Sequence, residues 1–135
     1  MRAILGDINI QGHLEILLLI LEGPTWGGVW KLMNLPLYTF GDLGLAPETV
    51  DAVIWELCQQ QEIILITANR NADSPDSLEA TICEQNRANS LPVFTLADSE
   101  RILHSRAYAE RVVERLLEYL IDIDNFRGTG RLYLP

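Results

Sequence analysis

The sequence predicts an α/β fold: a three-layer α/β/α sandwich with a mainly parallel central sheet. Three short, nearly uninterrupted apolar segments, at about residues 3–8, 62–67 and 92–96, are typical of parallel strands covered on both faces. Segments with helical periodicity separate them. Strands that alternate with helices indicate a parallel sheet with helices on both faces.

Size and composition favour a single domain spanning residues 1–135. Apolar residues make up 48% of the chain and charged residues 21%, enough to bury a core. The net charge is −9, which argues against tight nucleic-acid binding by the surface as a whole but leaves room for a local basic strip. The two cysteines, Cys58 and Cys83, form no C-x-x-C pair, so we expect two buried free thiols in a reducing compartment.

In the first half, residues 2–8 are predicted as a strand and residues 11–22 as a helix that Gly23-Pro24 ends. The apolar stretch at 14–21 is shorter than the roughly 20 residues that cross a membrane, and no signal peptide is visible. It favours a core helix or an oligomer interface. Residues 29–33 fit a strand or a helical turn, 37–40 favour a strand, and 47–61 a helix.

In the second half, a polar turn at 68–73 follows the strand at 62–67. The next helix is predicted to begin at Ser74, a capping residue, and to run to about residue 86 or 89. After the strand at 92–96, Asp98 or Ser99 caps either one long helix or two shorter ones over 99–122, and residues 131–134 have a strand-like pattern. Arg127 and Arg131 in this tail are interpreted as the only localised basic pair without nearby acids.

Acidic residues follow the predicted strands at their carboxyl ends, where functional sites of open α/β sheets lie. Carboxylates gathered there suit Mg²⁺ or Mn²⁺. The candidate metal ligands are Asp7, Asp51 and Asp73, with Asp76 as an alternative to Asp73 and Asp98 as a fourth. Each also has a structural interpretation: Asp7 as a strand end, Asp51 and Asp76 as residues that stabilise a helix start, and Asp98 as an N-cap.

The segment DLGLAPETVDAVIWEL at 42–57, followed by IILIT at 63–67, resembles the small PIN-like proteins related to VapC-type toxins. The stretch ILGDINI at 4–10 is similar to the family's first strand, which ends in an Asp. Counting back from Thr67 places the family's second acid on Asp51. The resemblance covers about residues 1–75 and implies a PIN-like ribonuclease fold, often dimeric and sometimes paired with an antitoxin.

The resemblance implies that Asp7 and Asp51 are catalytic and hold Mg²⁺ or Mn²⁺ together with Asp73, with RNA as substrate. Asn69 and Asn71 stand where the family has acidic residues, so the predicted site is partly degenerate. Arg70, in the same turn, would contact a phosphate or pair with Asp73. These three residues, Asn69, Arg70 and Asn71, are the candidate cofactor-binding residues.

The alternative function is a catalytically inactive protein-interaction module on the same fold, which binds a protein partner or forms a homodimer. The two asparagines, the net charge of −9 and the apolar stretch at 14–21 favour it. Both functions are expected of a cytoplasmic protein that does not bind membranes.

Overall fold

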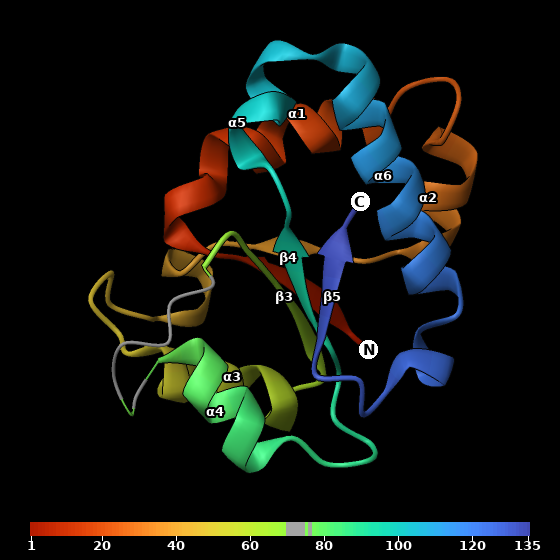
Figure 1. Ribbon diagram of the computed structural model, residues 1–135. Helices are drawn as coiled ribbons and strands as arrows, with labels where there is room; N and C mark the ends of the chain where they lie inside the picture. Colours follow the sequence, from red (N-terminus) through yellow and green to blue (C-terminus); the bar gives the residue numbers. More distant parts are fainter. Residues whose placement is uncertain (70–74, 76) are drawn as a thin grey trace.

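A five-stranded, all-parallel sheet forms the middle layer of this computed structural model, which describes residues 1–69, 75 and 77–135 (Figure 1). The strand order is β2-β1-β3-β4-β5. The strands are β1 (Ala3–Gly6), β2 (Leu37–Tyr38), β3 (Ile63–Thr67), β4 (Val93–Leu96) and β5 (Arg131–Leu134). The predicted strands at 62–67, 92–96 and 131–134 are confirmed, as is the α/β class with its three layers. The strand predicted over 3–8 is also present but ends earlier, at Gly6.

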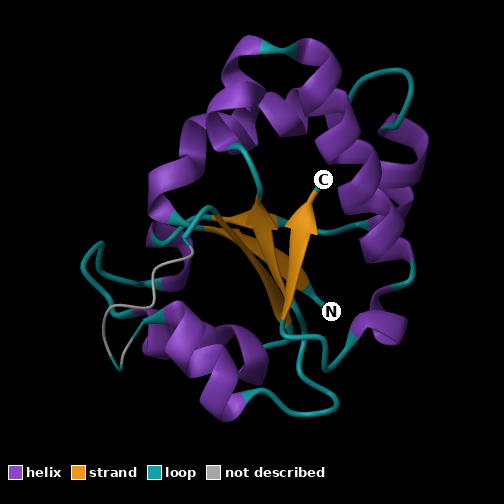
Figure 2. Cartoon of the chain, viewed as in Figure 1, coloured by secondary structure: helices purple, strands orange, loops and turns teal. Residues whose placement is uncertain are grey.

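Helices cover both faces of the sheet (Figure 2). One layer contains α1 (Gln11–Leu21), α5 (Ser99–His104) and α6 (Arg106–Ile121), which pack against one another, with α2 (Gly27–Met33) beside them. The other layer contains α3 (Asp51–Gln60) and α4 (Leu78–Gln85). Short 3₁₀ turns lie at Ile8–Ile10, Gly41–Leu43 and Ile123–Phe126.

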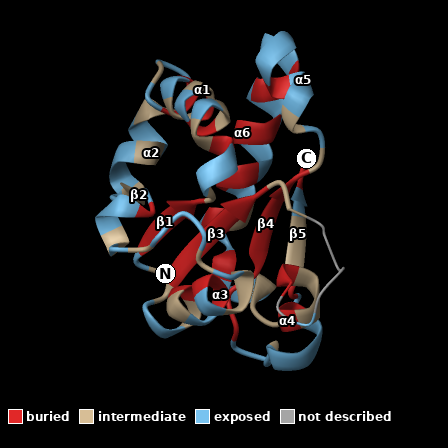
Figure 3. Ribbon diagram, turned by 90° about the vertical axis from the view of Figure 1, so that its left-hand side faces the viewer, coloured by how far each residue is buried: buried red, intermediate tan, exposed pale blue. Residues whose placement is uncertain are grey.

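The sheet separates two hydrophobic clusters. Ile4 and Ile64 pack toward α1 and α6, whereas their neighbours Leu5 and Ile63 pack toward α3. Successive side chains of a strand point to opposite faces, so a strand covered on both faces needs apolar residues throughout. The buried strands and exposed outer helix faces in Figure 3 follow from this requirement.

Two predicted helix starts are too early. The helix predicted from residue 47 begins at Asp51, because Pro47 and Glu48 form a turn and Val50 is extended. The helix predicted from Ser74 begins at Leu78, and Ser77 caps it by accepting a hydrogen bond from the Ala80 N–H. Ser74 itself lies outside the described residues.

Two alternatives that the sequence left open are decided. The segment 99–122 forms two helices, because Ser105 is extended and caps α6 by accepting from the Tyr108 N–H. The segment 29–33 is helical. Among the described residues, no helix is both long enough and apolar enough to cross a membrane.

The two cysteines differ in environment. Both thiols are free and both lie in helices, but Cys83 is exposed, so the prediction of two buried thiols is wrong for Cys83. Its position on the outer face of α4 explains the exposure. Cys58 is buried between α3 and the sheet, and burial raises the pKa of its thiol to about 12.

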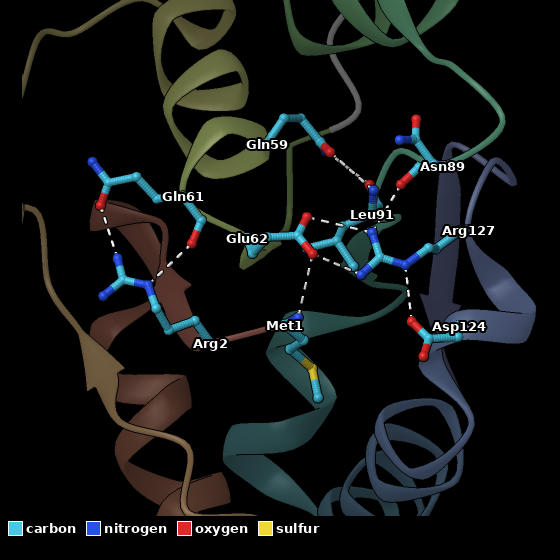
Figure 4. A network of polar contacts seen from close by, with 9 residues as sticks. All are labelled: Met1, Arg2, Gln59, Gln61, Glu62, Asn89, Leu91, Asp124 and Arg127. Carbon is cyan, nitrogen blue, oxygen red and sulfur yellow. Dashed lines mark hydrogen bonds and ion pairs between the residues drawn. The ribbon is translucent and has the colours of Figure 1, made fainter.

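A polar network closes the amino end of the sheet (Figure 4). Arg127 pairs with Glu62 at 2.7 Å and with Asp124 at 2.9 Å. The hydrogen bond and charge of Arg127 hold the pKa of Glu62 below its ordinary value. Arg127 therefore has acidic partners, and the prediction of a basic pair without acids is wrong. Asp124 lies three residues before Arg127 and was overlooked in the sequence, whereas Glu62 is 65 positions away and no local pattern indicates it.

Candidate functional site

Asp7 joins the carboxyl ends of two neighbouring strands. It directly follows β1, and its backbone N–H donates to the carbonyl oxygen of Ile66 at 2.9 Å. Its carboxylate Oδ2 accepts a hydrogen bond from the Thr67 hydroxyl, also at 2.9 Å. The side chain is half-buried, so Asp7 lies at the partly solvent-exposed edge of the sheet rather than in the hydrophobic core.

The first turn of α1 fixes the backbone around Asp7. The side-chain amide of Gln11 donates to the carbonyl oxygens of Gly6 and Asp7, at 3.2 and 3.0 Å. A Cβ atom on Gly6 would collide with the buried side chain of Leu14. Glycine at position 6 therefore allows α1 to pack closely against the strand that presents Asp7.

Asp51 connects three segments at the same edge. It begins α3, and its Oδ2 accepts from the Asn69 side-chain amide at 2.9 Å and from the Leu78 N–H at 3.2 Å. The acceptance from Leu78 supplies a partner to the first turn of α4, where backbone N–H groups lack helical partners. The structural interpretation of Asp51, that it lies in the first turn of a helix, is confirmed, and the residue also reaches a second helix.

Thr67 and Asn69 complete a continuous chain of hydrogen bonds. The backbone N–H of Asn69 donates to the Thr67 hydroxyl oxygen at 3.0 Å. The chain therefore runs from Asp7 through Thr67 and Asn69 to Asp51 and brings together three of the predicted site residues. Sequence reasoning used Thr67 only to mark the strand end. A hydroxyl that ends an otherwise apolar strand is the signal that points to its role.

Arg131 supports this turn from the far edge of the sheet. Only 8% of its side chain is exposed, and it donates to the carbonyl oxygen of Asn69 at 2.8 Å and to the Thr95 hydroxyl at 2.7 Å. It also pairs with Glu79 at 2.7 Å. Arg131 thus has an acidic partner as well, so both members of the predicted acid-free pair are corrected. Its contacts join β5, β4, the turn after β3, and α4.

The other predicted ligands have different outcomes. Arg70, Asn71, Asp73 and Asp76 lie outside the described residues. Asp98 caps α5 by accepting from the Arg101 N–H at 3.2 Å, which confirms its structural interpretation.

The described part of this chain of hydrogen bonds contains two carboxylates, Asp7 and Asp51, of the kind that a hard divalent cation binds. Mg²⁺ keeps several waters and is usually bound by one or two carboxylates, and Asp7 and Asp51 supply two. Each of these uses Oδ2 in the hydrogen bonds above, and among the described residues Oδ1 of neither has a partner. Asn69 turns its amide nitrogen toward Asp51, which directs its oxygen elsewhere. Within the described ranges, no cluster of three or more His, Cys, Asp or Glu residues could hold a metal.

Comparison of the chain with protein-family models, with curated proteins and with solved structures found no match.

Proposed function

We propose that this chain is a PIN-like domain that binds Mg²⁺ or Mn²⁺ through Asp7 and Asp51 and cleaves RNA. One observation carries the proposal: the hydrogen-bond chain Asp7–Thr67–Asn69–Asp51, which gathers two carboxylates at the carboxyl edge of a parallel sheet. The choice of RNA and of hydrolysis comes from the resemblance of residues 1–75 to the PIN-like family.

In this proposal each residue has a limited task. Asp7 and Asp51 offer Oδ1 to the cation, while their Oδ2 atoms stay engaged with Thr67 and Asn69, so the carboxylates are held in fixed orientations before the metal arrives. Once bound, the metal would activate a water and neutralise charge on a phosphodiester. Asn69 would orient Asp51. Asn71 and Asp73 would complete the ligand set, and Arg70 would meet a phosphate.

The first experiment is a Mg²⁺ and Mn²⁺ titration followed by thermal shift and calorimetry. At a tenfold excess over Kd, binding to the native state adds about 1.4 kcal/mol, or about 4–6 °C for a chain of this size. Asp7→Asn removes a charged ligand and should abolish the shift. Asp98→Asn is the matched control, because asparagine caps a helix as well as aspartate does and the shift should persist.

Cleavage is tested on the same proteins. Wild type and Asp98→Asn should cut single-stranded RNA in Mg²⁺, and Asp7→Asn should not. Equal cleavage by Asp7→Asn would refute the proposed role of this site, and the absence of a metal shift in the wild type would refute metal binding.

A second candidate function, an inactive interaction module, is favoured by exposed apolar side chains beside the α1 layer. Leu19 on α1 is 73% exposed and Leu32 on α2 is 87% exposed. Sedimentation velocity over a range of concentrations tests it. Association that Leu32→Ser weakens, together with no response to metal, would support this function, whereas a monomer at every concentration that co-purifies with nothing would contradict it.

A further inference from the structure

Arg101 and Arg111 differ from the other arginines that the structure describes. Six of those arginines donate hydrogen bonds or form ion pairs through their guanidinium groups; they are Arg2, Arg87, Arg106, Arg115, Arg127 and Arg131. Among the described residues, the guanidinium groups of Arg101 and Arg111 have neither. Both are exposed, and each lies over the ring of Tyr108, with guanidinium carbons 4.8 and 5.3 Å from the ring centroid.

The aromatic contact holds two cations together without neutralising them. The guanidinium groups of Arg101 and Arg111 lie close to each other, because both contact the ring of Tyr108. Tyr108 is itself buried, at 5% exposure, so it gives both arginines a fixed platform. A cation–π contact restrains a guanidinium and leaves its N–H donors available to an anion.

Some of the charges nearby are already paired. On α5 and α6, Glu100 lies 3.9 Å from His104, Glu110 pairs with Arg106 and Glu118 pairs with Arg115. Glu114, which lines a shallow hollow with Arg111, is the acid on these helices without an ion pair among the described residues. Exposed Asp98, which caps α5 beside Arg101, also contributes negative charge, as does Glu100 when His104 is neutral. The two arginines are therefore distinguished by guanidinium donors without a hydrogen bond or ion pair among the described residues, and not by a net positive corner.

The corner lies on the same edge of the sheet as the acidic residues. Arg101 is in the first turn of α5, which begins three residues after β4 ends, and Arg111 lines its hollow with Pro135, the residue after β5. Figure 3 shows α5 and the C-terminus together at the end of β4 and β5. Along the order β1-β3-β4-β5, the carboxyl edge thus passes from Asp7 and Thr67 to the two arginines.

We propose that Arg101 and Arg111, held over Tyr108, bind phosphates of a single-stranded RNA whose chain crosses the carboxyl edge of the sheet from the Asp7–Asp51 site. This inference rests on the proposed function and adds the path of the substrate to it. An arginine guanidinium group can donate two parallel hydrogen bonds to phosphate oxygens. Neighbouring strands are about 4.8 Å apart, so a few nucleotides cover the distance from β3 to β5.

The test is fluorescence anisotropy of a labelled single-stranded oligoribonucleotide in EDTA, which measures binding without cleavage. Arg101→Gln/Arg111→Gln should bind more weakly and lower the salt slope of the affinity by about 1.4, or 0.7 for each lost phosphate contact. Between about 50 and 200 mM salt, the loss of affinity should therefore be about sevenfold smaller for Arg101→Gln/Arg111→Gln than for wild type. Arg106→Gln/Arg115→Gln removes the same charge from paired positions of α6 and should bind like wild type.

Each other outcome overturns the inference. These are wild type without salt-dependent RNA binding, an unchanged slope in Arg101→Gln/Arg111→Gln, an equal loss in the control pair, or competition by polyglutamate as strong as by unlabelled RNA. Failure of the proposed function is seen separately, as a metal-induced thermal shift that is absent in the wild type or that persists in Asp7→Asn. Either result together with an intact arginine effect would mean that the protein binds RNA without the proposed metal site.

Discussion

Replacing Arg131 tests how much the turn behind the candidate site depends on a single buried side chain. Arg131→Met keeps an unbranched apolar stem and removes the guanidinium group with its donors to the Asn69 carbonyl and the Thr95 hydroxyl. Thr95 is fully buried, so its hydroxyl loses a partner that water does not replace. Glu79 is 41% exposed and can hydrate instead.

The expected cost follows from these two environments. An orphaned buried acceptor costs about 1–3 kcal/mol, and loss of a half-exposed carboxylate's ion pair costs about 0–1 kcal/mol. Removal of the buried charge offsets part of this, because a guanidinium is costly to desolvate. We therefore expect Arg131→Met to lower the free energy of unfolding by about 2 kcal/mol.

Thr95→Val supplies the decisive comparison. Alone, it removes the acceptor and leaves an Arg131 donor unsatisfied, at a cost of about 1–3 kcal/mol. In the double variant Arg131→Met/Thr95→Val both groups are apolar, so its cost should fall below the sum of the two single costs by at least about 0.5 kcal/mol. Urea denaturation with an unchanged m-value measures all three. Additive costs would refute the reasoning, because they would mean that the two side chains do not act as a pair.

Three further predictions concern other contacts. Thr67→Val leaves Asp7 without its side-chain donor, so it should lower the free energy of unfolding by about 1–2 kcal/mol and weaken Mg²⁺ binding, whereas Thr67→Ser should preserve both. Urea denaturation and calorimetry measure these two effects, and a Thr67→Val variant that behaves like wild type would contradict the contact. In the folded protein a disulfide reagent at pH 8 should modify exposed Cys83 quickly and Cys58 only on unfolding, because burial raises the pKa of Cys58 to about 12 and keeps its thiol protonated. Rapid modification of two thiols per folded chain would contradict this prediction. The pKa of Glu62 is lowered from 4.5, so the contribution of this carboxylate to stability is present above the unfolded pKa and is lost as pH falls through the folded pKa. The difference in unfolding free energy between wild type and Glu62→Gln should therefore shrink below about pH 4.5. A pH-independent difference would rule out the ion pair with Arg127 as its source.

The strands were predictable because their burial demands a local pattern. Residues such as Ile64 and Leu65 face opposite layers, and both layers require apolar side chains, so the sequence shows an uninterrupted apolar run. Helix starts were less predictable. Both Pro47 and Ser74 suit a first turn, but neither residue alone determines where helical hydrogen bonds begin, and the helices begin at Asp51 and Leu78.

The candidate site was predictable only in part. Asp7 and Asp51 were identified because strand ends of a parallel sheet converge, and the resemblance supplied the spacing. Arg131 was missed because its partner Glu79 is 52 positions away and its contact with Asn69 spans 62 positions. Such contacts follow from strand order, which no local pattern encodes.

The close approach of Gly6 to Leu14 makes the volumes at these two positions interdependent. Alanine at position 6 would displace a core leucine unless the residue at 14 became smaller, and a smaller residue there would leave a cavity unless position 6 grew. Gly6→Ala alone and Leu14→Ala alone should therefore each destabilise the fold, while the two together should partly compensate. Proteins that share this packing should keep the combined size of the two side chains roughly constant as their sequences diverge.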